Sequence, residues 1–163
     1  MSIADLENLC IQIQKPEGHS RCDIWYRPPN SNVGKFYTSR LLLTCLMPKM
    51  HVDYYILDDL NCGLWSPDLE SNSRSLIDIT ELYGLHQLIS EPTRITKPFS
   101  TMIDHIFTNK PDKIVCSGVF HVGISGHSLI HAFRKVSTGL HNKGHSNSIV
   151  HYRKFKNLNS ESF

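Results

Sequence analysis

Short segments with strand-like character limit the possible folds of this chain more than any other feature of its sequence. Apolar and polar side chains alternate, or apolar side chains run together, in segments of strand length that end at turn residues. These segments lie at residues 9–14, 22–26, 52–57, 85–89, 102–107, 113–120 and 128–133. They predict a domain in which strands supply most of the core.

Two other segments are expected to be helices. Residues 36–47 have helical composition and end at Pro48. A second helix is expected to begin at a Ser71 or Ser73 cap and to end with Gly84 as its C′ residue. Residues 58–63 and 95–100 are expected to be loops. Because helices alternate with strands early and strands dominate later, the pattern predicts an α/β (α+β) domain with a mixed sheet over residues 1–136.

Composition narrows the class of protein. A hydrophobic share of 40% is enough for a core and argues against disorder. No apolar run approaches the ~18 residues of a membrane span, and the acidic start shows no signal peptide. We therefore expect an intracellular protein, nuclear or cytoplasmic, without a membrane partner. The five cysteines are odd in number and widely spaced, so they are expected to be small buried residues rather than disulfide partners.

The small net charge of +2 conceals an uneven distribution. Residues 1–112 carry 10 basic and 14 acidic side chains, a net charge of −4, whereas residues 113–163 carry 7 basic and 1 acidic, a net charge of +6. The part from residue 137 onward is rich in small polar residues and is expected to be a polar, basic linker or tail. Such an end either binds a nucleic-acid backbone or is simply solvated.

Acidic and amide side chains follow the strand predicted at 52–57. Asp59 and Asn61 are two residues apart, so on an extended segment they would face the same cleft. A carboxylate there can hold Mg²⁺ or take a proton from water, and an amide can donate to a phosphoryl oxygen. The same residues are also favourable for a simple turn.

A second candidate group combines an acid and a histidine. Asp104 stands in an apolar strand, where a carboxylate needs a partner, and His127 lies in a Gly-rich loop before the last strand. A histidine oriented by an aspartate is a recurrent device for general acid/base chemistry. Otherwise Asp104 is a buried acid capping a loop and His127 is an ordinary exposed residue.

Two further possibilities come from neighbouring residues. Tyr26, Arg27 and Asn30 stand at a strand end, where a guanidinium can bind phosphate, although a proline-rich turn is the alternative. A zinc site built from three histidines is a remoter possibility. Its ligands would be His121, His127 and His131.

Taken in order, several motifs resemble those of the endonuclease/exonuclease/phosphatase family. They cover the chain from about Leu6 to Lys135, and the ordered set is much more specific than any single motif. The motifs lie at residues 25–30, 56–62, 84–94, 100–107 and 123–128. The closest type is the endonuclease of LINE-like, non-LTR retrotransposons, and residues 152–156 resemble the segment that leads toward a reverse transcriptase.

The resemblance implies a four-layer α/β sandwich that hydrolyses phosphodiesters with Mg²⁺ and nicks DNA. It assigns to Asp59 the acid that orients or deprotonates the attacking water, with Asn61 beside it. Asp104 would orient the catalytic His127, and Tyr26 would lie near the scissile phosphate. Arg27 and Asn30 are the candidate nucleic-acid contacts.

This sequence departs from the family pattern at three points. Asp58 replaces the glycine before the motif aspartate, and Gly126 replaces an acid of the metal site. Nothing before Leu6 supplies the family's first strands with their metal-binding glutamate. We therefore expect a partial sandwich with weak Mg²⁺ binding and little nuclease activity. We also expect self-association through uncovered sheet surface. The alternative is a non-catalytic module that binds nucleic acid or protein through its basic C-terminal part.

Overall fold

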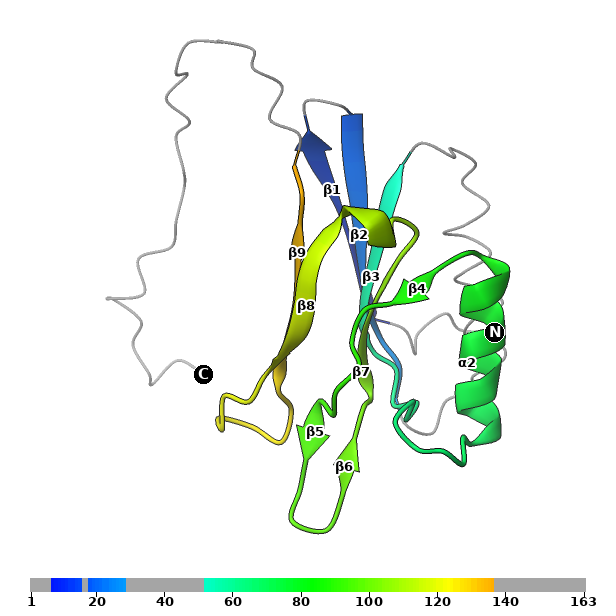
Figure 1. Cartoon of the computed structure of the whole chain (residues 1–163), viewed down its shortest axis with the longest axis vertical. Coiled ribbons are helices and arrows are strands. Elements are labelled where there is room, and N and C mark those ends of the chain that lie inside the picture. The colour runs from blue at the N-terminus through cyan, green and yellow to red at the C-terminus, as the bar shows by residue number, and fades with distance from the viewer. Residues whose placement is uncertain (1–6, 16–17, 29–51, 137–163) are drawn as a thin grey trace.

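The structure, a computed structural model, describes residues 7–15, 18–28 and 52–136 (Figure 1). The helix predicted at 36–47, the tail from residue 137 and the candidate DNA contact Asn30 lie outside these ranges. The described elements are β1 (Glu7–Lys15), β2 (Gly18–Tyr26), β3 (Asp53–Asp59), α2 (Ser71–Leu82), β4 (His86–Gln87), β5 (Arg94–Ile95), β6 (Ser100–Thr101), β7 (Asp104–Thr108), η1 (Pro111–Lys113), β8 (Ile114–Phe120) and β9 (Leu129–Arg134).

The main sheet has five strands in the order β1-β2-β3-β7-β4. β2 and β3 are parallel, whereas β1 pairs with β2, and β7 with both β3 and β4, in antiparallel fashion. A hairpin of β8 and β9 forms a second sheet, and β5 and β6 form a short third one. The predicted α/β class with a mixed sheet is confirmed.

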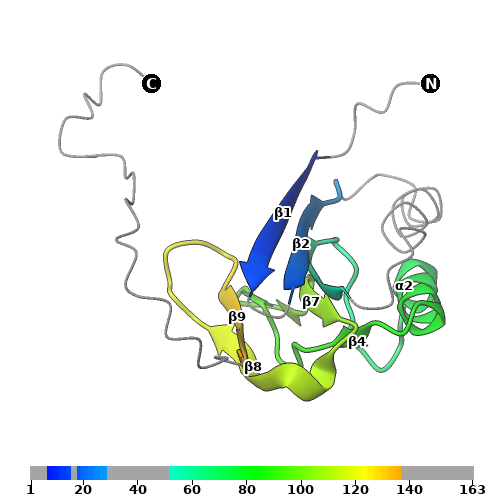
Figure 2. The same cartoon turned by 90° about the horizontal axis from the view of Figure 1, so that it is seen from above.

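The two faces of the main sheet are covered by different elements. Trp25, Ile56 and Phe107 face Leu76 of α2 in one apolar cluster. Ile106 and Leu57 belong to a second cluster with side chains of the β8–β9 hairpin. Figure 2 shows α2 and the hairpin on opposite sides of the main sheet. Within the described residues, helix, main sheet and hairpin are three successive layers of a sandwich.

The helix α2 begins and ends by different means. The predicted serine cap is wrong, because Glu70 is the N-cap residue, Ser71 is already helical and Ser73 is buried. The predicted end is correct. Gly84 has a φ of 63°, and the amides of Gly84 and Leu85 donate to the carbonyls of Glu81 and Thr80 at 2.9 and 2.8 Å. This is a Schellman motif, which needs a residue that accepts positive φ at C′.

Other expectations change in detail. The predicted loop at 95–100 is flanked by the paired strands β5 and β6, and the strand predicted at 85–89 is reduced to β4. The prediction of buried cysteines is wrong for Cys10 and Cys116, which are exposed, and correct for Cys62. Cys116 pairs in register with the exposed Phe133, on a face of β8–β9 that no described element covers.

The edge strand β1 also carries an uncovered apolar face. Leu9, Ile11 and Ile13 alternate along this strand and are 56%, 41% and 49% exposed. Self-association through this face stays a prediction. No helix in the described part of the chain combines the length and hydropathy required to cross a membrane.

Candidate active site

Three polar residues form one row across the end of the main sheet. Tyr26 of β2 is in register with Asp59 of β3, and Asp59 is in register with Asp104 of β7. Neighbours in register project to the same face of a sheet. The chain therefore collects a phenol and two carboxylates from distant parts of its sequence at a single sheet edge.

His127 joins this row from the loop that precedes β9. Its Nδ1 atom lies 3.1 and 3.2 Å from the two carboxylate oxygens of Asp104. The His127 side chain is 39% exposed and that of Asp104 is 14% exposed. The Ser125 hydroxyl accepts a hydrogen bond from the His127 amide at 3.1 Å, which fixes the loop locally. The pairing of Asp104 with His127 that the sequence led us to expect is present in the structure.

Thr93 connects the segments that carry this pair. It is completely buried, and its hydroxyl oxygen accepts hydrogen bonds from the amides of Ile103 and Asp104 at 3.2 and 3.1 Å. Its carbonyl accepts a hydrogen bond from the Ser128 amide at 2.7 Å. Thr93 therefore holds the start of β7 against the loop of His127. Sequence reasoning placed it in a motif without giving it a role, because a buried threonine has no distinctive sequence signal.

Asn61 is not placed as expected. The segment is not extended there, because Asn61 has a φ of 49°. Its amide nitrogen Nδ2 donates to the Arg27 carbonyl at 3.0 Å, and its backbone N–H lies 3.3 Å from Asp59 Oδ1. Asn61 thus contacts Asp59 through its backbone, while its side chain ties two loops together.

Arg27 does not fit the role of a phosphate contact. It is only 1% exposed, and its guanidinium donates to the carbonyls of Leu60, Asn61 and Pro28. Its burial keeps it from a substrate, and its hydrogen bonds to these carbonyls hold the loop after β3. Tyr26, by contrast, is 41% exposed.

Burial and neighbouring charge alter the acidity of Asp59. Burial raises its pKa above the ordinary value, and the Asp104 carboxylate raises it further. The Asn61 N–H, His127 and Arg94 act in the opposite direction. A carboxylate whose pKa is raised is a better proton acceptor near neutral pH. Arg94 is exposed beside this group, and its backbone forms an isolated antiparallel β-bridge with the backbone of His127. Sequence reasoning left Arg94 without a role as well.

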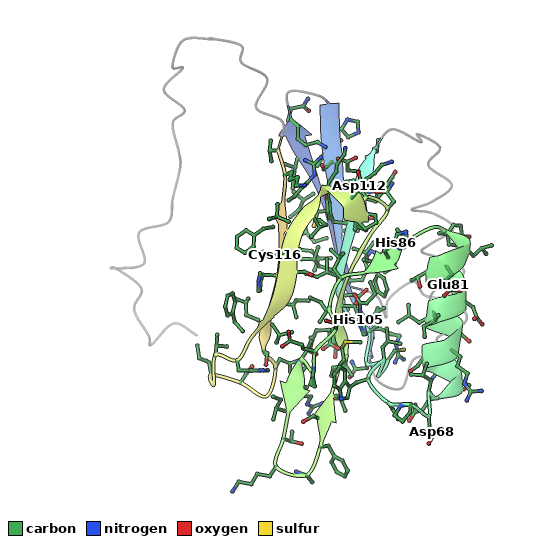
Figure 3. The ribbon with its side chains drawn as sticks, viewed as in Figure 1. Asp68, Glu81, His86, His105, Asp112 and Cys116 are labelled. Carbon is green, nitrogen blue, oxygen red and sulfur yellow. The ribbon has the colours of Figure 1, made fainter. Side chains whose placement is uncertain are left out.

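A second pair, Asp58 and His105, lies on the opposite face of the same strands. These two residues are in register with each other, and both are buried (Figure 3 marks His105 on β7). His105 contacts the Cys62 carbonyl through Nε2 at 3.0 Å and the Gln87 amide through Nδ1 at 2.6 Å. Burial lowers the pKa of His105 to about 4. Burial also raises the pKa of Asp58 well above its ordinary value, and the charges of Asp104 and Asp59 add to this effect.

The donor set of the open face fits a divalent cation. Ligand atoms of Asp59, Asp104 and His127 all lie within 4.8 Å of one another. Two carboxylates suit Mg²⁺, which is bound by few protein oxygens and keeps several waters. The alternative of a zinc site built from His121, His127 and His131 is not met in the described residues, where this is the one such group. His121 contacts the Ser128 hydroxyl, and His131 stacks on Phe120 instead.

Comparisons with solved structures identify the fold. The endonuclease domain of TRAS1, a telomere-specific non-LTR retrotransposon, matches with a TM-score of 0.66 at 16% identity, over 82% of this chain and 71% of that one. An endonuclease/exonuclease/phosphatase from Beutenbergia cavernae matches with a TM-score of 0.54 at 15% identity, over 74% of this chain and 37% of that one. Beta toxin from Staphylococcus aureus matches with a TM-score of 0.53 at 15% identity, over 78% and 57%.

These matches concern the fold and not the sequence. The chain spans less than two thirds of the last two structures. No protein-family model matches the sequence, and no curated protein matches it either. The chain has the fold of endonuclease/exonuclease/phosphatase domains, because its structure superimposes on theirs despite the low sequence identity.

Proposed function

We propose that this chain carries the site of a metal-dependent phosphodiesterase that nicks DNA, in a form whose catalysis is impaired. The observation that carries the proposal is the Asp104–His127 pair beside Asp59. An aspartate that orients a histidine next to a second carboxylate is suited to acid/base chemistry on a phosphodiester. The fold shared with the TRAS1 endonuclease domain makes DNA the first substrate to test.

Each residue of the row has a distinct role in this proposal. Asp59 orients the attacking water or accepts its proton, and the Asn61 N–H holds the Asp59 carboxylate in place. Asp104 fixes the ring of His127, which donates a hydrogen bond to a phosphoryl oxygen. The exposed hydroxyl of Tyr26 lies near the scissile phosphate. Arg94 replaces Arg27 as the candidate contact for a phosphate group, because it is the exposed one of the two.

Asp59 and Asp104 would hold the metal ion. When bound, Mg²⁺ stabilises the negative charge that develops in phosphoryl transfer. Gly126 offers no ligand where the family places an acid, so we expect the ion to bind weakly. Asp58 offers no ligand either, because it faces the core, and burial followed by the charges of Asp104 and Asp59 raises its own pKa well above the ordinary value. A protonated carboxyl is a poor ligand.

The magnitudes favour strongly reduced activity. A positioned acid or base contributes roughly 10²–10⁴ in rate, and Asp59 with His127 can preserve a contribution of that kind. The metal ion contributes several further kcal/mol of charge stabilisation, which weak binding would forfeit.

The proposal is tested by plasmid nicking with the purified chain. In Mg²⁺ we expect little or no nicking, and we expect whatever remains to disappear on His127→Ala. DNA binding should persist in the absence of cleavage. Vigorous nicking in Mg²⁺ that His127→Ala abolishes would contradict the proposed impairment. DNA binding that substitutions at Asp59, Asp104 and His127 leave unchanged would support a separate binding surface in the basic C-terminal part.

A further inference from the structure

An apolar groove lies between the main sheet and the β8–β9 hairpin, apart from the row of polar residues. Its volume is about 320 Å³, within the range typical of small-molecule sites. Its walls come from both sheets. Ile13, Cys22, Leu57 and Ile106 line it from the main sheet, and Ile130 and Ala132 line it from β9.

Three cations gather at one end of the groove around a single acid. Asp53 is buried, and its carboxylate contacts Lys15 Nζ at 2.6 Å, Lys113 Nζ at 3.1 Å and Arg134 Nη2. The side chains of Lys15 and Arg134 line the groove and are only 7% and 13% exposed. One carboxylate thus serves two largely buried cations and a third that is partly exposed.

The local charge is therefore positive. The three cations and Asp53 together carry a formal charge of +2. Asp112 is also close, since its charge helps to raise the pKa of Tyr55 in the groove wall, and including it leaves +1. Figure 3 marks Asp112 just before β8, at this end of the molecule. Burying positive charge is costly unless an anion compensates it.

A buried hydroxyl points to a ligand independently of the charges. Ser20 is 2% exposed and lines the groove beside Lys15, and its Oγ atom has no hydrogen-bond partner among the described residues. A buried hydroxyl without a partner costs free energy that a polar ligand atom would recover.

We propose that this groove binds a single-chain amphiphilic carboxylate, such as a free fatty acid. The carboxylate would lie at the Lys15, Ser20 and Arg134 end and the hydrocarbon chain along the apolar walls. The groove lies between two facing sheet surfaces rather than beyond a free strand edge. A polypeptide there would bury its own backbone amides without ladder partners, whereas a hydrocarbon chain has no polar groups to bury.

The groove also sets the direction of the ligand. Asp53 and Leu57 are four residues apart on β3, about 13 Å of strand, and Asp59 stands one further step along the same face. The chain end would thus point toward the candidate active site without entering its row of polar residues. The proposal does not depend on the proposed function.

Binding is tested with the complete chain at neutral pH, with decanoate and decyltrimethylammonium as probes of equal chain length and opposite charge. Calorimetric titration gives the affinity, and backbone amide shifts locate the probe. We expect decanoate to bind at least about tenfold more tightly than the cation, with shifts at Ile13, Ser20 and Leu57. Equal affinity for the two probes, or shifts confined to Leu9 and Ile11, the part of β1 outside the groove, would overturn the proposal.

A matched pair of variants tests the headgroup contact. Lys15→Met should weaken decanoate binding about tenfold and leave binding of the cationic probe unchanged or improved. Lys97→Met removes an exposed lysine elsewhere and should change neither affinity. Decanoate binding that Lys15→Met leaves unchanged would contradict the proposal. If Lys15→Met does not fold, the comparison of the two probes on the unmodified chain still decides it.

A last arm separates a free amphiphile from a membrane surface. Phosphatidylglycerol vesicles present the same negative charge in a bilayer, and we expect no sedimentation of the chain with them. Vesicle binding in the absence of decanoate binding would overturn the proposal in favour of a lipid surface.

Discussion

Two aspartate–histidine pairs lie on opposite faces of one end of the β3–β7 ladder, and their surroundings give them different chemical properties. Asp104 and His127 lie on the half-open face and contact each other directly. Asp58 and His105 lie on the buried face, in register, but His105 contacts Gln87 and the Cys62 carbonyl, and no described side chain pairs with the Asp58 carboxyl.

The difference shows that residue type alone does not define a catalytic pair. Adjacent residues of a strand project to opposite faces, so Asp58-Asp59 and Asp104-His105 each supply one residue to the core and one to the site. Burial favours the neutral forms of Asp58 and His105, because it raises the pKa of the acid and lowers the pKa of the histidine. The buried pair therefore has a structural role, and the open pair is available for chemistry.

The largest expected contrast between the pairs is in stability. His105→Ala should lower the free energy of unfolding by about 3 kcal/mol, because it creates a cavity and leaves the contacts to Gln87 and Cys62 unmade. His127→Ala should lower it by less than about 1 kcal/mol, since its ion pair is partly exposed. Urea denaturation of the two variants measures both values, and equal losses would remove the distinction.

A contrast of similar size is expected in pH dependence. The folded-state pKa of His105, about 4, is below its unfolded value, so the folded state binds fewer protons between these values and stability falls as the pH is lowered from neutral toward 4. The loss amounts to about 3 kcal/mol over that range. Raised pKa values at Asp58 and Asp59 act in the opposite direction, because their contribution is present at low pH and is lost as pH rises.

The difference between the wild type and His105→Gln isolates this contribution. Denaturation at several pH values should show the wild type losing about 3 kcal/mol more than the variant between pH 7 and pH 4. Parallel stability curves for the two proteins would show that His105 does not titrate as described.

A smaller effect on stability should accompany a change in the open pair. Thr93→Val removes the hydroxyl that accepts from the Ile103 and Asp104 amides, and we expect it to cost about 2 kcal/mol. The chemical shift of the His127 ring should change as well, because Thr93 holds both segments of the pair. Thr93→Ser keeps the hydroxyl and serves as the control. A valine variant with unchanged His127 signals would limit Thr93 to a packing role.

Sequence patterns predicted much of this molecule because alternation and end signals act locally. The strand patterns at 22–26 and 52–57 and the glycine at the end of α2 each follow from short-range geometry. The Asp104–His127 contact was expected from the chemistry of a buried acid and from the resemblance, since the two residues are far apart in sequence.

The remaining features depend on tertiary packing. Nothing near Arg27 in the sequence signals that it will be buried against carbonyls of residues 60 and 61. Asn61 has a positive φ and its side chain donates to the Arg27 carbonyl, a distant partner, so an extended segment was the wrong expectation. Cys10 is exposed on the edge strand β1, and Cys116 is exposed on a face of β8 that no described element covers. No local pattern could reveal either position.

A Mg²⁺ titration of Gly126 variants tests the proposed metal site most directly. The site has room for an acid, because a Cβ atom at Gly126 would meet nothing nearer than Arg94 Nε at 4.0 Å. We expect weak binding by the wild type, about tenfold tighter binding by Gly126→Asp, no gain in Gly126→Asn, and loss of the gain when Asp59→Asn is added. Equal affinities of the Asp and Asn variants, or a gain that survives Asp59→Asn, would show that Asp59, Asp104 and His127 do not form a metal site.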